Sequence, residues 1–323
     1  SLLVDAAGKV IGRAKQFETD LIFFDIESKN KIEMVGEPRI SKNDDHEQVW
    51  NALVLCLRDY VNKNGFKSVV LGLSGGIDSA VCASIAADAI GADRVFGVSM
   101  PSRYSSEHSR SDADDSAERI GLHFRTEPIE SLVNAFESQL GLDGVAAENL
   151  QARMRGVILM GLSNAEGHLT LTTGNKTELA VGYSTIYGDS VGGFAPIKDV
   201  EKTLVWQLAK WRNGHAAANG QTPPIPENSI SKPPSAELRP DQTDQDSLPE
   251  YELLDELLDN YVEKRLGRDE IVAIGFDAAV VDRIIGLVDR AEWKRRQGAI
   301  GPKITGMAFG RDRRLPITNR SHK

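Results

Sequence analysis

The sequence has few cysteines, no long apolar run and no excess of basic residues, and each absence excludes a class of protein. Cys56 and Cys82 are the only two cysteines, too few for a disulfide framework and typical of a reducing cytoplasm. No apolar segment approaches the roughly 20 residues that a membrane-spanning helix requires. The first residues lack the basic-then-apolar pattern of an export signal. We therefore expect a cytoplasmic protein with no membrane partner.

Acidic residues outnumber basic residues, and the rest of the composition is ordinary. The chain has 47 Asp and Glu against 38 Lys and Arg, a formal net charge of −9. This balance argues against a protein that binds nucleic acid through a general basic surface. Hydrophobic residues make up 41% of the 323 residues, enough for a full core without disulfides or a structural metal. The length fits two domains or one large α/β domain.

Predicted strands and helices alternate through the middle of the chain. β-rich segments that predict strands occupy residues 68–73, 94–100, 122–126 and 168–173. Helical periodicity predicts helices at residues 49–61, 79–90, 107–120, 129–140 and 147–164. This alternation implies right-handed βαβ crossovers. We therefore expect an α/β fold, a doubly wound parallel sheet with helices on both faces.

The later part of the chain begins with a proline-rich segment. Seven of the 13 prolines lie within residues 221–250, which predicts a long loop because proline lacks a backbone donor. Such a loop is either a lid over a site or a static surface loop or subunit contact. Further helices are predicted at 248–262, 269–274 and 277–290, and a basic tail follows at 311–323.

A glycine-rich turn joins a predicted buried strand to a predicted helix. Residues 71–79 read LGLSGGIDS. The two glycines let the backbone approach an anion closely, and the helix start adds unpaired N–H donors, so a phosphate is the natural ligand. Asp78 would repel a phosphate unless a cation lay between them. The turn therefore predicts a phosphate site that includes Mg²⁺.

Two common phosphate-binding motifs are absent from this turn. It lacks the Gly-Lys-Ser/Thr ending of a Walker loop, and it lacks the GxGxxG spacing of dinucleotide-binding folds. The alternative interpretation is structural: the glycines only make a tight turn, and Asp78 caps the following helix.

The SGGIDS turn resembles the pyrophosphate loop of ATP pyrophosphatases, which cleave ATP to AMP and pyrophosphate while they adenylate an acceptor. Three later motifs, TGNKTE at 173–178, YSTIYGD at 183–189 and PPSAEL at 233–238, are similar to NAD synthetases. The resemblance extends over residues 47–318. It is specific to the synthetase half of the long, glutamine-dependent NAD synthetases, whose actinobacterial members share runs such as PSRYSS and QTPPIP.

The resemblance implies an activity, a fold and partners. Members of the family use ATP and Mg²⁺ to amidate deamido-NAD (nicotinate adenine dinucleotide) to NAD through an adenylate intermediate, releasing AMP and pyrophosphate. They share a Rossmann-like fold of the adenine nucleotide alpha hydrolase type, here with a helical C-terminal extension. The expected partners are deamido-NAD, ammonia, an N-terminal glutaminase domain that supplies the ammonia, and further copies of the chain in a homo-oligomer.

The resemblance also implies which residues form the site. The expected ATP-binding residues are Leu71, Gly72, Leu73, Ser74, Gly75, Gly76, Ile77, Asp78, Ser79, Met100, Thr173, Lys202 and Ser235. The expected deamido-NAD-binding residues are Asn149, Arg153, Glu178, Tyr183, Ser184, Asp189, Trp293, Lys294 and Arg311. Asp78 and Glu178 are the expected Mg²⁺ ligands. Asp78, Asp189 and Lys202 are the expected catalytic residues, Asp189 by orienting the pyridine ring or accepting a proton from ammonia.

The chain departs from the shorter family members at two positions. Ile186 replaces a lysine, and Gly193 replaces a second acid. The basic tail, with Arg311, is the candidate substitute for these contacts; a solvated terminus is the alternative interpretation.

The N-terminal residues resemble the last strands of a nitrilase-like glutaminase domain. Strands are predicted at 2–4 and 21–26, and a charged stretch at 28–48. The expected organisation is a domain remnant at 1–30, a linker to about 46, a NAD synthetase domain at 47–295 and a tail at 296–323. The chain shows no candidate nucleophile for glutamine hydrolysis, because both cysteines fall in predicted helices as core residues.

Other functions fit parts of the pattern. Another ATP pyrophosphatase ligase or amidotransferase shares the turn. A non-catalytic adenine-nucleotide sensor would keep the glycines without needing both Asp78 and Glu178. A sulfate-activating or reductase relative should carry a reactive cysteine motif in its tail, and the tail has none.

Overall fold

The computed structural model describes residues 1–26, 32–34, 44–240 and 242–318. Most of the charged stretch predicted at 28–48, and the last five residues of the predicted tail, lie outside the described residues. Within the described part of the chain, no helix is long and apolar enough to cross a membrane.

A parallel sheet of four strands lies at the centre of the main body. Its order is β7-β6-β5-β8. The strands are β5 (Val69–Gly72), β6 (Val95–Ser99), β7 (His123–Thr126) and β8 (Leu169–Thr170). From β5 the chain first adds strands on one side and later adds β8 on the other. The carboxyl ends of β5 and β8 therefore flank a topological switch point, the place where ligands bind in such sheets.

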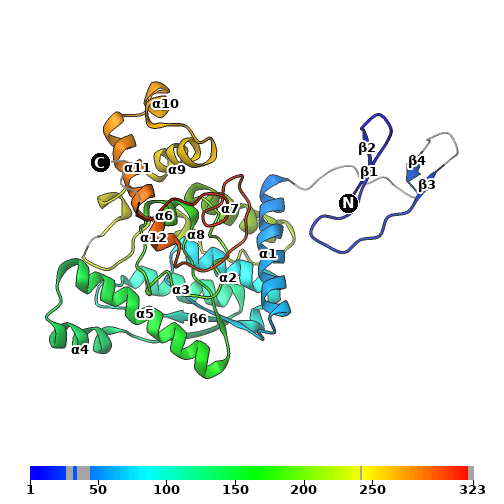
Figure 1. The fold of residues 1–323 in the computed structure, drawn as a ribbon. Coiled ribbons are helices and arrows are strands. Elements are labelled where there is room, and N and C mark those ends of the chain that lie inside the picture. Colours follow the sequence, from blue (N-terminus) through cyan, green and yellow to red (C-terminus); the bar gives the residue numbers. More distant parts are fainter. Residues whose placement is uncertain (27–31, 35–43, 241, 319–323) are drawn as a thin grey trace.

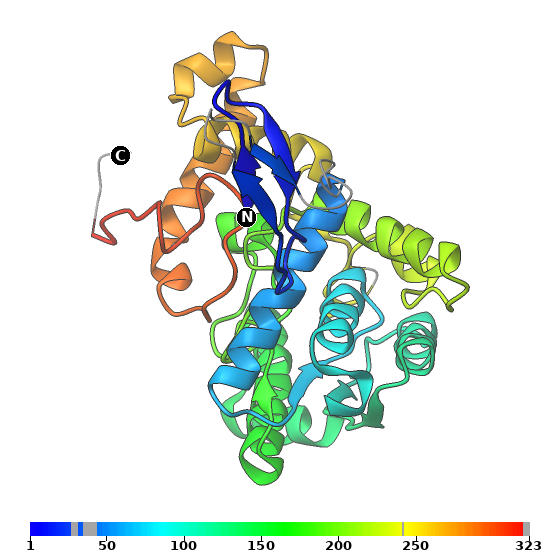
Figure 2. The same ribbon diagram turned by 90° about the vertical axis from the view of Figure 1, so that its right-hand side faces the viewer.

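Helices cover both faces of the sheet (Figures 1 and 2). Side chains alternate along β5, so each face of this strand packs against a different set of helices. Val69 and Leu71 belong to the core formed with α1, α2, α3 and α7. Val70 faces the other way, into the core formed with α4 and α5. The bounds of these helices are α1 (Asp45–Lys63), α2 (Ile77–Ile90), α3 (Glu107–Ile120), α4 (Glu130–Leu140), α5 (Gly144–Glu166) and α7 (Lys202–Ala218).

A third hydrophobic core forms around a short helix that follows β8. Buried side chains of this helix, α6, pack with the C-terminal helices, drawn in gold and orange in Figure 1. The elements are α6 (Lys176–Val181), α9 (Tyr251–Leu258), a π-helical turn (Asp259–Glu263), α10 (Arg268–Ala273), α11 (Ala278–Arg290) and α12 (Glu292–Arg295). The C-terminal helices therefore support the segment that leaves the switch point.

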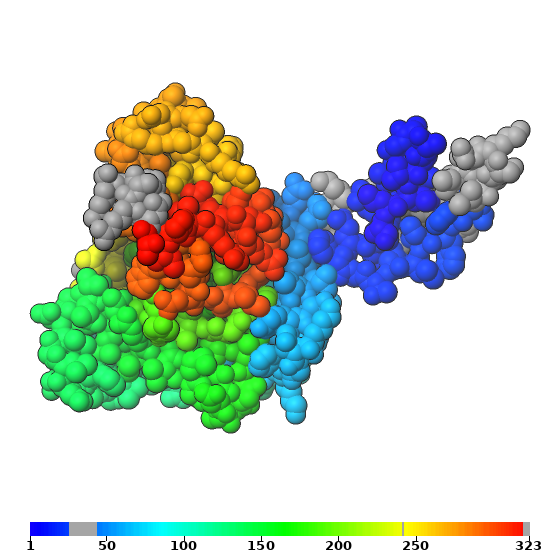
Figure 3. Space-filling model, viewed as in Figure 1, coloured from blue at the N-terminus to red at the C-terminus, as the bar shows by residue number. Residues whose placement is uncertain are grey.

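Two small hairpins precede α1. β1 (Leu2–Val4) pairs with β2 (Val10–Arg13), and β3 (Phe24–Ile26) pairs with β4 (Ile32–Met34), both antiparallel. The hairpins extend beyond α1, away from the sheet (Figures 1 and 3). The sequence analysis missed β2 and β4 and made β3 too long, because strands of three or four residues carry little periodic signal.

Four further predictions differ from the structure in their limits. The strand predicted at 168–173 pairs in the sheet only over Leu169–Thr170, before the chain turns toward α6. The helix predicted at 49–61 starts earlier because the Asp44 side chain accepts from two backbone N–H groups. The helix predicted at 248–262 begins after Pro249 and ends in a π-helical turn. The loop predicted at 221–250 contains short helices at α8 (Glu227–Ser231) and Asp244–Asp246.

Candidate active site

The glycine-rich turn lies at the carboxyl end of β5, at the start of α2. Gly76 is the N-cap of this helix and has no side chain to cap it, so the first N–H groups of α2 are free of a side-chain cap. Ser74 and Ser79 hold the turn from inside: Ser79 Oγ donates to Gly76 O at 2.9 Å, and the two hydroxyls lie 3.2 Å apart. The turn thus presents backbone donors at the positive end of a helix dipole.

Gly75 occupies a position that a side chain cannot enter. Its φ is +76°, in the left-handed region, and a Cβ atom would lie 2.2 Å from Ser109 O in α3. Ser229 Oγ also donates to Gly75 O at 2.9 Å. The glycine therefore lets the turn lie directly against α3.

The flanking turn residues predicted for ATP binding are mostly buried. Leu71, Leu73 and Ile77 are core residues. Gly72 lies against Met100, since a Cβ on this glycine would be 3.1 Å from Met100 Cε. The side chains of these residues pack at the end of the strand, so their backbone atoms are the groups that could contact a ligand.

Three predicted site residues meet beside the turn. Lys202 Nζ donates to Asp78 and lies 3.7 Å from Glu178 Oε1. Asn175 Nδ2 donates to Asp78 Oδ1 at 3.0 Å, and the same side chain caps α6 and forms a capping box with Glu178. Two carboxylates from different strand ends thus share one buried ammonium. Asn175 was missed by the sequence analysis, although an Asn three residues before a Glu is a local capping signal.

The electrostatics of this cluster favour an added cation. Burial, and then the nearby Asp78 charge, raise the pKa of Glu178 well above its usual value. Burial disfavours the Lys202 ammonium, but Asp78 and Glu178 outweigh that effect and hold the pKa of Lys202 high. With Glu178 ionised, one ammonium faces two carboxylates, and a divalent cation bound beside them would favour that ionised form. The pair of carboxylates fits Mg²⁺, a hard cation that usually takes one or two carboxylates plus substrate phosphates. Among the described residues, no three His, Cys, Asp or Glu side chains gather into a metal-binding group.

The YSTIYGD segment lies across α5. Thr185 Oγ1 donates to Asn149 Oδ1 at 2.7 Å, and Arg153 Nε donates to Ile186 O at 3.3 Å. Asp189 is held by Thr185 N, which donates to its Oδ1 at 2.6 Å. Burial raises the pKa of Asp189 to about 6. Asn149, Arg153 and Asp189 thus all contact residues 185–186, and their binding of deamido-NAD stays a prediction.

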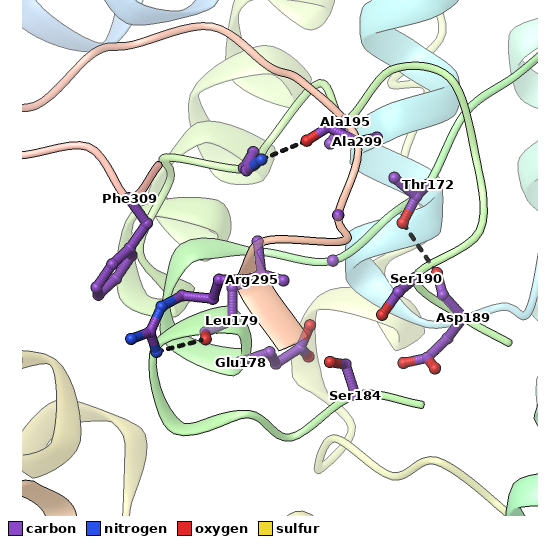
Figure 4. A pocket seen from close by; sticks show the side chains of 13 residues that line it. Thr172, Glu178, Leu179, Ser184, Asp189, Ser190, Ala195, Arg295, Ala299 and Phe309 are labelled. Atoms are coloured by element: carbon purple, nitrogen blue, oxygen red, sulfur yellow. Dashed lines mark hydrogen bonds between the residues drawn. The ribbon is translucent and has the colours of Figure 1, made fainter. Parts of the chain in front are cut away.

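Glu178 and Asp189 line one pocket between α6 and the 183–190 segment. Figure 4 shows their carboxylates on the two sides of Ser184. The lining residues are Thr172, Gly174, Glu178, Leu179, Ser184, Asp189, Ser190, Ala195, Lys198, Arg295, Gly298, Ala299 and Phe309. Thr173, half-buried, lies between two of them in the chain. Glu178, from the cluster with Asp78, and Asp189 therefore border the same pocket.

Of the two predicted residues near the C-terminal end of the chain, Lys294 contacts this pocket and Trp293 precedes Lys294 in the chain. Lys294 Nζ donates to Gly182 O and Ser184 O, both at 2.8 Å, and burial lowers the pKa of Lys294. Trp293 is 46% exposed, so its ring is accessible to a ligand.

The predicted basic tail starts near Lys198, which lines this pocket, and continues along other elements. Arg311 is within electrostatic range of Cys56 in α1 and of Lys198. Arg313 stacks on the Tyr261 ring at 4.4 Å. Arg314 Nε donates to Gly310 O at 2.8 Å. A contact between Arg311 and a dinucleotide stays a prediction.

The proline-rich segment docks on the main body through polar contacts. Glu237 accepts from Ser106 Oγ at 2.8 Å and Ser109 Oγ at 2.6 Å, at the start of α3. Ser235 Oγ donates to Gln242 O at 2.5 Å, within the segment itself. The predicted ATP contact of Ser235 therefore requires this hydroxyl to be shared or released.

The segment also brings in an acid that the sequence analysis missed. Asp244 is buried and accepts from Tyr251 Oη at 2.7 Å. Its charge acts on Glu178, Lys202 and Tyr183, and burial together with Asp244 raises the pKa of Tyr183. No local pattern marks Asp244, because its neighbours come from distant parts of the chain.

Known proteins of one family match most of this chain. The NAD synthase family model matches residues 49–298. A glutamine-dependent NAD(+) synthetase of Acinetobacter baylyi is 50% identical over 327 residues, which cover 99% of this chain and 59% of the relative. That of Aquifex aeolicus is 44% identical, covering 100% of this chain and 62% of the relative. The chain thus spans about three fifths of the length of these relatives.

Solved structures give the same result. The chain is similar to an ADP complex of a glutamine-dependent NAD+ synthetase from Acinetobacter baumannii, with a TM-score of 0.66 and 46% identity over 97% of this chain and 57% of that one. An NMN synthetase from Francisella tularensis has a TM-score of 0.67 and 27% identity over 81% of this chain and all of that one. With its parallel sheet, its glycine-rich turn and a family match over most of its length, the chain belongs to the NAD synthase family.

Proposed function

We propose that the chain carries out the synthetase reaction of the glutamine-dependent NAD synthetases: ATP-dependent amidation of deamido-NAD to NAD, with AMP and pyrophosphate as the other products. The observation that carries this proposal is the meeting of Asp78, Glu178 and Lys202 beside the glycine-rich turn. A sensor that only bound nucleotide would not need two partly buried carboxylates around one buried ammonium. They are what a phosphoryl-transfer site with a divalent cation uses.

In this proposal the turn binds the phosphates of ATP. The N–H groups at the start of α2 hold the β- and γ-phosphates, which leave as pyrophosphate. Lys202 offsets part of their charge, and Asp78 and Glu178 are the Mg²⁺ ligands. When bound, Mg²⁺ neutralises charge on the phosphate oxygens and orients the α-phosphorus for attack.

The acceptor is the nicotinate carboxylate. One carboxylate oxygen forms a bond to the α-phosphorus of ATP while the bond from that phosphorus to the pyrophosphate oxygen breaks. Ammonia then adds to the carbonyl carbon, loses a proton and expels AMP. Asp189 lies in the pocket beside Glu178 and, as a carboxylate, would orient the pyridine ring or accept this proton. The docked proline-rich segment would exclude water, which otherwise hydrolyses the adenylate.

The remaining predicted residues complete the proposal. Thr173, Met100 and Ser235 would bind ATP, and Asn149, Arg153, Tyr183, Ser184, Trp293, Lys294 and Arg311 would bind deamido-NAD. Residues 1–30 would be the end of a glutaminase domain that supplies ammonia, joined by a linker to the synthetase domain at 47–295 and the tail at 296–323. We place the reaction in the cytoplasm, in a homo-oligomer.

Phosphorus NMR tests the reaction directly. With ATP, Mg²⁺, ammonium and deamido-NAD, we expect AMP and pyrophosphate in equal amounts, and no ATP consumption when deamido-NAD is omitted. ADP and orthophosphate as the stoichiometric products would contradict the proposal. The same assay is run with nicotinate mononucleotide in place of deamido-NAD, because the Francisella relative is named for the mononucleotide product. Faster turnover with nicotinate mononucleotide would show that it, and not deamido-NAD, is the substrate.

A further inference from the structure

The helix that carries Glu178 is too short to hold its own orientation. α6 has six residues, and isolated helices of that length are unstable in water. Glu178 is nevertheless aimed at Lys202 and Asp78 from the opposite strand end. A metal-binding side chain must be held to within about 0.5 Å, so contacts from outside α6 have to supply the rigidity.

The first residue of α6, Lys176, makes these contacts although the function proposed above gives it no role. It is 3% exposed, and its Nζ donates to Glu263 Oε1 at 2.5 Å and Thr305 Oγ1 at 2.7 Å. The same Nζ lies 3.2 Å from Asp199 Oδ1. Its backbone N–H donates to Val200 O at 2.8 Å. One side chain thus joins α6 to three other segments.

The partners of Lys176 belong to elements that frame the site. Asp199 lies three residues before Lys202, and it accepts from the backbone N–H groups of Ile304 and Thr305, both at 2.9 Å. Glu263 ends the π-helical turn. Lys176 therefore fixes the start of α6 relative to the start of α7, where Lys202 lies, and relative to the C-terminal helices.

We infer that Lys176 is a positioning residue that holds Glu178 in its metal-binding orientation. The inference rests on the proposed function for the role of Glu178 as a metal ligand. Without the ammonium, the buried Asp199 carboxylate and the partly buried Glu263 carboxylate would lie close together unneutralised, and they would separate. The start of α6 would then keep its backbone bond to Val200 O and the bond from Lys202 N to Thr177 Oγ1 as links to the start of α7, and with the side-chain link lost Glu178 would move relative to Asp78. Outer contacts of this kind typically change metal affinity by about 10- to 100-fold.

The test compares Lys176→Met with a matched control. Arg212 lies in α7, and its Nε lies 2.8 Å from Asp88 Oδ2 in a partly buried ion pair. Arg212→Met removes this ion pair and leaves α6 unchanged. Mn²⁺ is the probe, and its dissociation constant is measured by electron paramagnetic resonance with α,β-methylene-ATP present. We expect Lys176→Met to weaken Mn²⁺ binding about tenfold and to lower kcat more than it raises the KM for deamido-NAD. Arg212→Met should lower the Tm and leave the Mn²⁺ constant unchanged.

Two further variants separate positioning from stability. Lys176→Met/Glu263→Gln removes the repulsion, so its Tm should recover while Mn²⁺ binding stays weak; Lys176→Arg should keep most of the Mn²⁺ affinity. Wild-type Mn²⁺ binding in Lys176→Met, or recovery of both properties in the double variant, would overturn the inference. If Lys176→Met does not fold, the double variant decides alone. Mn²⁺ binding is measured without deamido-NAD, so it can be tested separately from the reaction. A wild-type chain that binds Mn²⁺ but makes no NAD would refute the proposed function, and the Lys176 variants would still test this inference.

Discussion

Gly75→Ala, compared with Gly65→Ala as a matched control, separates the effect of backbone conformation in the glycine-rich turn from the effect of its packing. Gly75 and Gly65 have almost the same backbone conformation, with φ of +76° and +78°. Alanine in this left-handed region costs about 1–2 kcal/mol at either position. A Cβ on Gly65 would have nothing within 4 Å, whereas on Gly75 it would lie 2.2 Å from Ser109 O. Only Gly75→Ala therefore adds a steric overlap.

The overlap sets the size of the functional effect. The Ser109 carbonyl belongs to the backbone of α3 and cannot rotate away, so the turn must move by about 1 Å to reach ordinary contact. A misplacement of about 1 Å costs about a hundredfold in rate, or about 2.7 kcal/mol of transition-state stabilisation. We expect kcat/KM for ATP to fall by that factor in Gly75→Ala and to stay at the wild-type value in Gly65→Ala.

Denaturant unfolding and steady-state kinetics on both variants check this reasoning. Both should lose about 1–2 kcal/mol of unfolding free energy from the backbone conformation, and Gly75→Ala more from the overlap. If kcat/KM for ATP in Gly75→Ala stays within threefold of that in Gly65→Ala, the close approach of the turn to α3 does not position ATP, and the argument is wrong.

Three further results are expected. Asp78→Ala and Glu178→Ala should each lower turnover at limiting Mg²⁺ by about a hundredfold or more. Circular dichroism should show that both variants keep the fold. Wild-type activity in either variant would show that the replaced residue is not a metal ligand. Desolvation raises the pKa of Asp189 from 3.8 to about 6, so this group favours the folded state below pH 4 and loses that contribution as the pH rises to 6. Asp189→Asn should therefore be more stable than wild type at pH 8, by less than the pKa shift alone implies because the residue is exposed to solvent. The gap should close at pH 4 in urea unfolding, and an equal gap at both pH values would contradict the assignment. With ¹⁵N-labelled ammonium the chain should make labelled NAD, faster as the pH rises because only ammonia has a lone pair, and efficient incorporation from ¹⁵N-amide glutamine would reveal a glutaminase site.

Local sequence patterns were sufficient for the sheet and the turn. Buried β-rich segments followed by helical periodicity predict parallel βαβ units, and the structure confirms the parallel sheet and its helices on both faces. The glycine pair before Asp78 was recognisable because strand, turn and helix start are adjacent in the chain. The two N-terminal hairpins were only partly recognised, since strands of three or four residues contain too few alternations.

Contacts between distant residues could be obtained only through the resemblance or through the structure. Lys202 and Asp78 are 124 positions apart, and no periodicity relates them. Their meeting follows from the strand order, which places the ends of β5 and β8 side by side. Asp244 and the Lys176 network had no signal in the sequence at all, because a buried charge is identified by the partners that fold around it.

The sequence by itself determined which segments become strands and helices and where a phosphate-binding turn lies, because those properties depend on neighbours within one or two helical turns. The tertiary structure decided which charges share a site: it set one ammonium between Asp78 and Glu178, buried Lys176 between Asp199 and Glu263, and turned the basic tail toward α1 and Tyr261. Electrostatic energy depends on distance in space and on burial, and neither quantity exists until the sheet has brought its strand ends together.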